Sequence, residues 1–238
     1  MRLEGALPVA WDAPVDALMS TRAGGVSVGP WASLNLGIAV GDDPAAVAEN
    51  RRRFAVALGA EPVWQRQVHG TVVLRLGVDD PDHPADAAWT DRPGLACSVQ
   101  VADCLPVLLA HRDGRAVAAA HAGWRGLAGG VLENTVRALC AGIGCDAQDL
   151  LAWLGPCIGP RRFEVGADVL AAFADSPQHF VSRPRPDGAA RWLADLPALA
   201  RRVAGGGWCT VEDASRFFSF RRDGVTGRMA AAVACRPR

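Results

Sequence analysis

The pattern of apolar and polar positions predicts a run of buried strands in the middle of the chain. Residues 95–101 alternate and residues 105–110 are continuously apolar, which is typical of two strands separated by a short interruption. An Asp-Gly turn signal follows, and residues 116–120 are again apolar, so the second and third strands are expected to form a hairpin. His121 is then expected just past the end of a buried strand.

Helices are predicted on both sides of these strands. Pro44 suits a first helical position, and Val47, Phe54 and Leu58 share one face of a helix that ends at Gly59. Further helices are predicted over residues 127–141, 165–174 and 196–204, and further strands over residues 151–154 and 229–234. Strands and helices do not alternate strictly, which favours an α+β fold over a doubly wound sheet. We interpret residues 1–238 as a single domain, because no stretch resembles a long linker.

Composition excludes several classes of function. The 238 residues carry 25 basic and 25 acidic groups, every basic group is arginine, and neither lysine nor tyrosine occurs. Schiff-base enzymes and Walker-type phosphate loops need lysine, so both are excluded. Zero net charge argues against nucleic acid as a partner, and no apolar run reaches the ~18 residues of a membrane span. We therefore expect a cytoplasmic protein with a small-molecule partner, either monomeric or weakly homo-oligomeric. The seven cysteines are expected to be free thiols.

Three separate segments each place a metal ligand or nucleophile beside small residues. They read QVHG at residues 67–70, ADCLP at 102–106 and HAGWRG at 121–126. Each has an ordinary explanation when taken alone, as a turn histidine or a core cysteine. Together, however, His69, Cys104 and His121 form a three-ligand set that leaves one position open on zinc, as in catalytic sites. Asp103 is either a partner of a ligand imidazole and a proton carrier, or a strand terminator, and both interpretations stay open.

Polar and glycine-rich segments supply candidate contacts to a substrate. Guanidinium groups bind phosphate in a bidentate manner, although a surface ion pair is the alternative for each arginine. The residues expected to contact substrate are Arg22, Asn35, Arg51, Gln67 and Arg125. The other histidines, His83, His111 and His179, lie in polar or turn-like stretches and are expected at the surface.

Ten ordered motifs carry a resemblance to a known family. They read STRAGGVS, SLNLG, VGDD, ENRRRF, QVHG, ADCLPVLL, HAGWRG, GPCIG, FEVG and RFFSFRRDGVTGR, and they span residues 20–228. The chain resembles the bacterial polyphenol oxidase or laccase-domain proteins, also known as purine nucleoside phosphorylases and peptidoglycan editing factors. The resemblance implies mixed sheets layered between helices and a metal site of His69, Cys104 and His121. The chain departs from the family pattern at Phe163, Val211 and Phe220, where tyrosines are expected.

The resemblance also implies a function, with alternatives. It implies a zinc enzyme that cleaves adenosine, inosine, guanosine or methylthioadenosine with phosphate and deaminates adenosine. Copper-dependent phenol oxidation is an alternative, because His₂Cys ligation also occurs in blue-copper sites. Five histidines and no His-x-His pair are nevertheless too few for a multicopper centre. A metal-free cysteine hydrolase or peptidoglycan-precursor editing factor, with Cys104 as nucleophile and His121 as base, is another alternative. A binding protein without turnover would be expected to lose a ligand, and none is lost.

Overall fold

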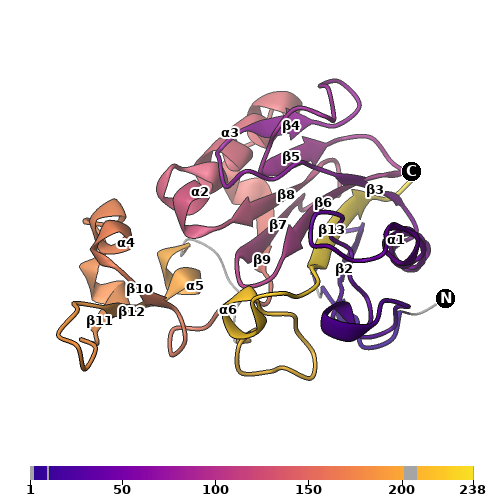
Figure 1. Ribbon diagram of the computed structural model, residues 1–238. Coiled ribbons are helices and arrows are strands. Elements are labelled where there is room, and N and C mark those ends of the chain that lie inside the picture. Colours follow the sequence, from indigo (N-terminus) through magenta and orange to yellow (C-terminus); the bar gives the residue numbers. More distant parts are fainter. Residues whose placement is uncertain (1–2, 10, 201–207, 238) are drawn as a thin grey trace.

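Two five-stranded mixed sheets form the body of the protein (Figure 1). The structure, a computed structural model, describes residues 3–9, 11–200 and 208–237. The first sheet has the order β1 (Leu7–Pro8), β2 (Val15–Met19), β13 (Met229–Cys235), β6 (Leu95–Val101) and β3 (Glu61–Trp64). The second has the order β4 (Val73–Arg75), β5 (Ala87–Thr90), β8 (Val117–Ala122), β7 (Leu105–His111) and β9 (Leu150–Leu154). Each contains a parallel pair, β3 with β6 and β4 with β5.

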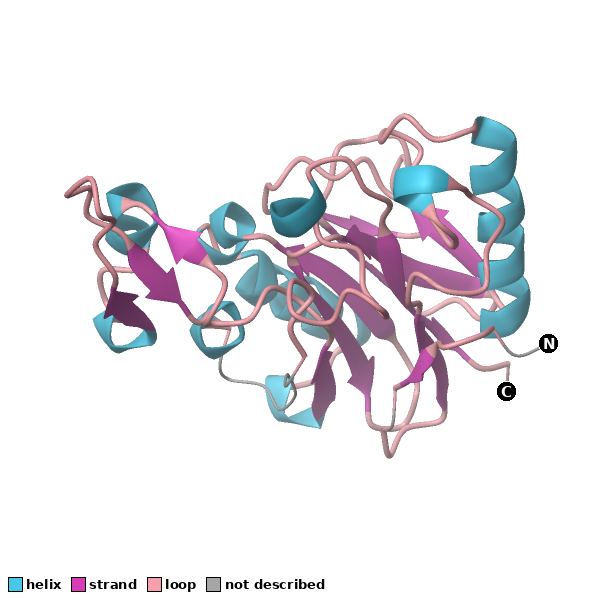
Figure 2. Ribbon diagram, turned by 60° about the horizontal axis from the view of Figure 1, so that its bottom comes forward, coloured by secondary structure: helices cyan, strands magenta, loops and turns pink. Residues whose placement is uncertain are grey.

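The two sheets pack face to face, and a helix covers the outer face of each (Figure 2). Helix α1 (Pro44–Leu58) packs Phe54 against the first sheet, and α3 (Val131–Ile143) packs on the second. Along β6, Ala96 faces α1 while Val99 faces the core between the sheets. Because both faces of the central strands are buried, these strands read as continuous apolar runs rich in alanine. The expected α+β fold, with mixed sheets between helices, is confirmed.

Most of the predicted elements occur where they were expected. The strands β6, β7, β9 and β13 agree with prediction, and so does helix α1 with its cap at Gly59. The β7–β8 hairpin is also confirmed, with antiparallel pairing around a turn in which Gly114 has a φ of 67°. Cys97, Cys104, Cys140, Cys145, Cys157 and Cys209 are free thiols, as predicted. No helix among the described residues is long and apolar enough to cross a membrane.

Four predictions about element bounds were wrong. His121 lies within β8 and not beyond it, because the strand continues to Ala122. The helix predicted over residues 127–141 is two helices, α2 (Trp124–Ala128) and α3, which are separated where Gly130 adopts a φ of 91°. The helices predicted over residues 165–174 and 196–204 are shorter, as α4 (Ala167–Ala172) and α5 (Leu196–Leu199). Residues 201–204 lie outside the described residues.

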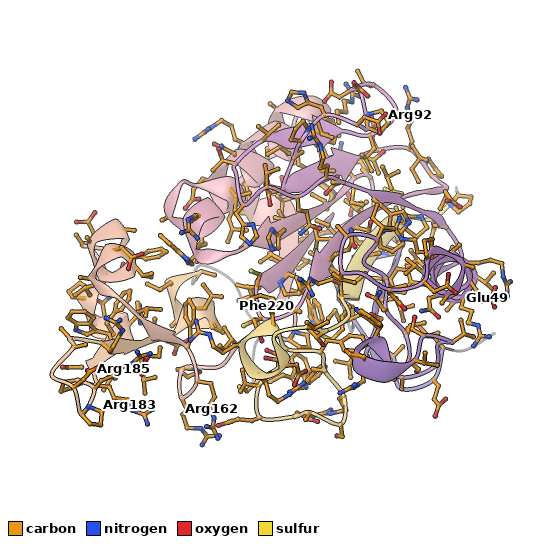
Figure 3. All side chains as sticks on the ribbon, viewed as in Figure 1. Glu49, Arg92, Arg162, Arg183, Arg185 and Phe220 are labelled. Atoms are coloured by element: carbon orange, nitrogen blue, oxygen red, sulfur yellow. The ribbon has the colours of Figure 1, made fainter. Side chains whose placement is uncertain are left out.

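A smaller three-stranded sheet projects to one side of the body (Figure 1). Its order is β10 (Glu164–Val165), β12 (Trp192–Ala194) and β11 (Phe180–Ser182), accompanied by α4 and α5. Short 3-10 turns occupy Gly29–Trp31, Ala147–Asp149 and Pro177–His179. Helix α6 (Phe220–Asp223) lies between this small sheet and the body, and Phe220 projects there (Figure 3). Phe163 before β10, Leu196 of α5 and Phe220 of α6 line one side of the cavity described below.

Candidate active site

Cys104 lies where the chain crosses from one large sheet to the other. Strand β6 belongs to the first sheet and β7 to the second, and residues 102–104 join them. Asp103 adopts a φ of 90°, a left-handed conformation that costs roughly 1–3 kcal/mol for a residue with a side chain. Its carboxylate accepts hydrogen bonds from Thr210 Oγ1 at 2.7 Å and from the backbone N–H of Arg221 at 2.6 Å. These two bonds hold the sharp bend that presents Cys104.

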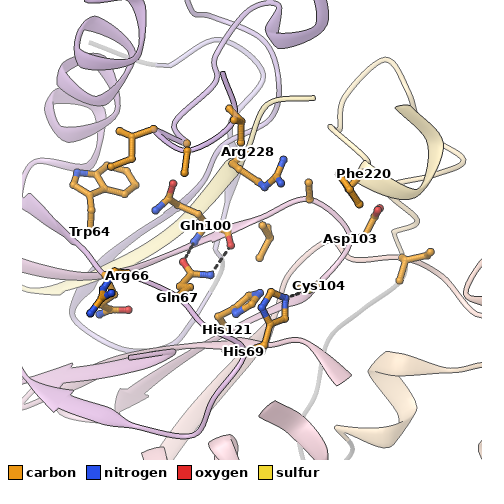
Figure 4. Close-up of a pocket in the computed structure, with 18 of the residues that line it drawn as sticks. Trp64, Arg66, Gln67, His69, Gln100, Asp103, Cys104, His121, Phe220 and Arg228 are labelled. Atoms are coloured by element: carbon orange, nitrogen blue, oxygen red, sulfur yellow. Dashed lines mark hydrogen bonds between the residues drawn. The ribbon is translucent and has the colours of Figure 1, made fainter. Parts of the chain in front are cut away.

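The three predicted metal ligands converge at this crossing (Figure 4). The ligand atoms of His69, Cys104 and His121 all lie within 4.8 Å of one another. Cys104 Sγ is 3.7 Å from His69 Nε2, and the two imidazole rings meet edge to face with centroids 4.7 Å apart. His121 is buried, Cys104 is partly buried and His69 is exposed. The set therefore has one side open to the cavity.

Asp86 holds two of these ligands in place, and the sequence analysis missed it. Its buried carboxylate accepts the Nδ1–H of His121 at 2.8 Å and the backbone N–H groups of Val68, His69 and Gly70 at 2.7–3.0 Å. Three successive N–H groups around His69, which has a φ of 60°, form an anion-binding nest for this carboxylate. A carboxylate behind a ligand imidazole fixes its tautomer and leaves Nε2 free for a metal.

Asp103 does not orient an imidazole. Both of its oxygens are occupied by Thr210 and Arg221, and the imidazole partner is Asp86 instead. The proton-carrier interpretation of Asp103 stays a prediction, because each oxygen accepts only one hydrogen bond and the residue lines the cavity described below. A signal for Asp86 was present in the sequence: an isolated acid directly before the apolar run that forms β5.

The hydrogen bonds within the group favour a charged thiolate. Burial raises the pKa of the Cys104 thiol, but hydrogen bonds from His121 and His69 outweigh burial and lower this pKa to about 6. Burial lowers the pKa of His121, but Asp86 and Cys104 outweigh it and raise this pKa to about 9. The protein without metal therefore holds a thiolate beside an imidazolium at neutral pH.

The residues fit a bound metal ion. Two imidazole nitrogens and one thiolate are a donor set that suits zinc or copper. A Cβ at Gly123 would lie 3.1 Å from Cys104 Sγ and 2.7 Å from His69 Cδ2, so the glycine keeps the space between these ligands open. The group could thus hold a metal with one coordination position facing the cavity.

Alkylation of Cys104 in the metal-free protein should depend on pH with a midpoint near pH 6. The thiolate is the reactive form, so the iodoacetamide rate should rise through the pKa of about 6 and then level off. Mass spectrometry of the Cys104 peptide measures this rate. His121→Ala should move the midpoint upward, because it removes the larger of the two histidine hydrogen bonds. A wild-type midpoint above about pH 8, where an ordinary thiol titrates, would contradict this account.

A cavity of about 1070 Å³ opens above the three ligands. This volume lies at the upper end of the range for small-molecule sites. Its walls come from both large sheets, the 37–40 loop, Phe163 before β10, Leu196 of α5 and helix α6. Its aromatic lining residues are Trp64, Trp124, Phe163 and Phe220. Phe163 and Phe220 are two of the positions where the family pattern led us to expect tyrosine. The cavity can therefore contact a planar ligand but offers no phenol hydroxyl.

Two of the five predicted substrate contacts line the cavity. Arg51 is one of them, and Gln67 is the other. Each end of the Gln67 carboxamide already makes one hydrogen bond: Nε2 donates to the Gln100 carbonyl at 2.9 Å and Oε1 accepts from the Gln100 N–H at 2.7 Å, which leaves one N–H and one lone pair for a ligand. Gln67 therefore positions Gln100, whose side chain projects into the cavity in Figure 4.

The other three predicted contacts lie outside the cavity lining. Arg22 donates to the backbone carbonyls of Ala32 and Ala214 and packs over a phenylalanine ring. Asn35 is buried and bonds its own loop, and Arg125 lies exposed over the ring of Trp124. Arg228, which the sequence analysis missed, lines the cavity instead. Its position at the end of the last quoted motif, directly before an apolar strand, was the available signal.

A second group of metal-capable side chains lies at the opposite end of β7. His111, Cys145 and Asp149 place ligand atoms within 4.8 Å of one another, and His111 is buried although it was expected at the surface. The His111 ring is already engaged, because Nδ1 accepts the N–H of Asp113 and Nε2 lies 2.9 Å from the Arg115 guanidinium. A guanidinium at a ring nitrogen opposes a bound cation, so this group is a weaker candidate than the first.

Fold and site together define a protein with a candidate His₂Cys metal centre between two sheets, at the floor of a large cavity. Residues 16–236 match the family described as multi-copper polyphenol oxidoreductase laccase, so the chain belongs to this family. The resemblance inferred from the ten motifs is thereby confirmed.

Relatives and solved structures agree with this assignment. The chain is 49% identical to the purine nucleoside phosphorylase PA4543 of Pseudomonas aeruginosa, over 94% of this chain and 95% of that protein. It is 46% identical to the purine nucleoside phosphorylase YfiH of Escherichia coli, over 94% and 96% of the two chains. The crystal structure of Neisseria meningitidis protein NMB0706 has a TM-score of 0.88 at 44% identity and covers 98% of this chain and 100% of its own.

Proposed function

We propose that this protein is a zinc-dependent purine nucleoside phosphorylase that also deaminates adenosine. The observation that carries the proposal is the convergence of His69, Cys104 and His121 on the floor of a cavity that is also lined by partly buried arginine side chains. The names of the relatives support the same reaction class. The substrates are adenosine, inosine, guanosine or methylthioadenosine together with phosphate, and the protein acts in the cytoplasm as a monomer or weak homo-oligomer.

Phosphorolysis makes specific demands on the cavity. A phosphate oxygen attacks C1′ of the ribose while the C1′–N9 bond breaks, which gives a free base and ribose 1-phosphate. The cavity must therefore hold an anion and a planar base at the same time. Arg51 and Arg228 offer positive charge, and Trp64 and Phe220 offer apolar rings to the base.

The protein residues around the centre fix the ligands for a metal. His69, Cys104 and His121 would hold zinc, which supplies a Lewis acid and a source of hydroxide at neutral pH when bound. Asp86 keeps the proton of His121 on Nδ1, so that Nε2 presents its lone pair to the centre. The nest of backbone N–H groups around His69 keeps the Asp86 carboxylate charged, because these bonds and the bond to His121 lower its pKa despite burial.

A metal-free cysteine hydrolase is a second candidate function, and one observation favours it. The Asp86 carboxylate is hydrogen-bonded to His121, and His121 is hydrogen-bonded to Cys104, whose pKa is about 6. This is the arrangement of an activated nucleophile, its base and an orienting acid. His69 has no necessary role in that mechanism, which gives a way to separate the two functions.

Elemental analysis paired with product chromatography tests the proposed function. The purified protein should contain about one zinc per chain, and adenosine with phosphate should yield adenine and ribose 1-phosphate. Without phosphate, the remaining product should be inosine from deamination. Copper in place of zinc, together with oxidation of phenols, would overturn the proposal. Turnover that survives thorough chelation and stops on alkylation of Cys104 would favour the cysteine hydrolase.

A further inference from the structure

Four arginines in the described part of the chain line the cavity, and two of them, Arg51 and Arg228, are partly buried while the other two are exposed. Arg51 comes from α1 and Arg228 from the residue before β13, and neither forms an ion pair among the described residues. A buried charge without a counter-charge is costly, and such groups are normally paired or ligated. The arrangement therefore indicates an anion that binds from the cavity.

Arg51 is held with one side of its guanidinium unused. Nε donates to the Leu36 carbonyl at 2.9 Å, and the group stacks over the Trp64 ring with its Cζ 4.2 Å from the ring centroid. Its Nη2 is buried and has no hydrogen-bond partner. Burial lowers the pKa of Arg51 to about 10, as expected for a cation that lacks a counter-charge. Buried polar atoms that lack a partner in the protein commonly mark the place of a ligand or ordered water.

Arg228 is fixed beside the same short segment. The Leu36 N–H donates to the Arg228 carbonyl at 2.9 Å, while the Arg228 N–H donates to Asn35 Oδ1 at 2.8 Å. A Cβ at Gly37 would lie only 2.7 Å from Arg228 Cγ, so the glycine lets this side chain cross the loop. Asn35, which we expected to contact substrate, thus positions Arg228 instead.

The Arg228 side chain points into the cavity between Gln100 and Phe220 (Figure 4). Nη1 donates to the carbonyls of Thr226 and Gly227, which leaves Nη2 without a hydrogen bond among the described residues. Burial lowers the pKa of Arg228, and the negative charges of Cys104 and Asp103 oppose this shift. Arg51 and Arg228 therefore flank residues 36–37 and both line the cavity.

We propose that Arg51 and Arg228 form a phosphate-binding subsite beside the Leu36–Gly37 backbone. Two guanidinium groups match the charge and the planar, bidentate hydrogen bonding of a phosphate dianion. This inference deepens the proposed function, on which it rests, because it assigns the place of the second substrate. The same chemistry would accept inorganic phosphate or a phosphate ester carried by a nucleotide, and the experiment separates these two sources.

Thermal unfolding of the zinc-loaded protein tests the subsite without measuring turnover. A ligand that binds only the folded state raises the Tm with its concentration, which yields a Kd for inorganic phosphate at constant ionic strength. Arg51→Gln and Arg228→Gln should each weaken phosphate binding by about 10-fold or more, since each removes a hydrogen bond to a charged group. Arg52→Gln is the matched control: it is the next residue of α1, is exposed and pairs with Glu49, so it should bind phosphate like the wild type.

Loss of folding does not threaten this test. Arg51→Gln removes the hydrogen bond to Leu36 and the stacking on Trp64, so phosphate binding is taken from the phosphate-dependent change in Tm of each folded variant and not from its starting Tm. Arg51→Lys keeps the charge as a second variant. Equal phosphate stabilisation of the wild type and both glutamine variants would overturn the subsite. No stabilisation of the wild type by phosphate or by adenosine 5′-monophosphate would also overturn it.

The same thermal titration, carried out with inorganic phosphate and with adenosine 5′-monophosphate, distinguishes the two sources of the phosphate group. Arginine-dependent stabilisation by inorganic phosphate supports the phosphorylase. Arginine-dependent stabilisation by adenosine 5′-monophosphate alone supports the subsite and assigns the phosphate to a nucleotide substrate, which would overturn phosphorolysis. Binding of phosphate through both arginines in a protein that releases no ribose 1-phosphate likewise keeps the subsite and rejects the proposed function.

Discussion

His69→Ala should remove the metal and lower nucleoside cleavage by roughly 10³-fold. The exposed imidazole is one of three ligands, and two remaining ligands do not retain zinc at ordinary concentrations. A metal ion stabilises charge in the transition state by several kcal/mol, and each 1.36 kcal/mol is a tenfold change in rate. Because His69 is exposed, the variant should fold normally. The measurements are zinc per chain and kcat/KM for inosine with phosphate.

His69→Ala also separates the two candidate functions. In a metal-free cysteine hydrolase the nucleophile, base and orienting acid are Cys104, His121 and Asp86, so hydrolysis would survive the change with a small loss. His83→Ala serves as the control, since it removes another exposed histidine that does not line the cavity. Full cleavage by the His69→Ala protein would reject the metal mechanism.

The metal ligands could be predicted from the sequence because each lies in a short motif at a strand edge. The donor atoms of two histidines and one cysteine were enough to select these three residues, although the sequence does not show how their segments approach one another. Local apolar patterns also predicted the two strands on either side of residues 102–104 and the interruption between them. The sequence could not show that residues 102–104 carry the chain from one sheet to the other. A bend within one sheet and a crossing between two sheets give the same apolar pattern.

The substrate contacts were harder to predict because they depend on tertiary packing. Arg22 lies between Thr21 and Ala23, and Arg51 lies between Asn50 and Arg52, and neither local sequence shows whether its arginine reaches the cavity. Arg22 donates to distant backbone carbonyls, while Arg51 lines the cavity and has a buried Nη2 without a hydrogen-bond partner. Which carbonyls lie within reach is decided by contacts over 192 residues in the case of Arg22 and Ala214. No local pattern carries that information.

Replacing Asp86 should produce the largest loss of stability among the residues of the site. Each carboxylate oxygen accepts two N–H donors: Oδ1 those of His69 and His121 Nδ1, and Oδ2 those of Val68 and Gly70. In Asp86→Asn, either orientation of the amide would turn an NH₂ group toward two donors. The isosteric change should therefore cost about 3 kcal/mol or more in the free energy of unfolding. It should also weaken zinc binding by about 10- to 100-fold, because His121 loses its orienting partner.

Urea unfolding and competitive zinc titration measure these effects, and their pH dependence identifies the carboxylate charge as the cause. The pKa of Asp86 is lowered in the folded protein, so its contribution is complete above the unfolded value of about 3.9 and is lost as the pH falls through the folded value. The difference in the free energy of unfolding between the wild type and Asp86→Asn should thus be largest near neutral pH and should decrease in acid. Asp175→Asn, at an exposed position, should show no such difference. A difference in the free energy of unfolding that stays constant from neutral pH into strong acid would mean that Asp86 acts through packing and not through its charge.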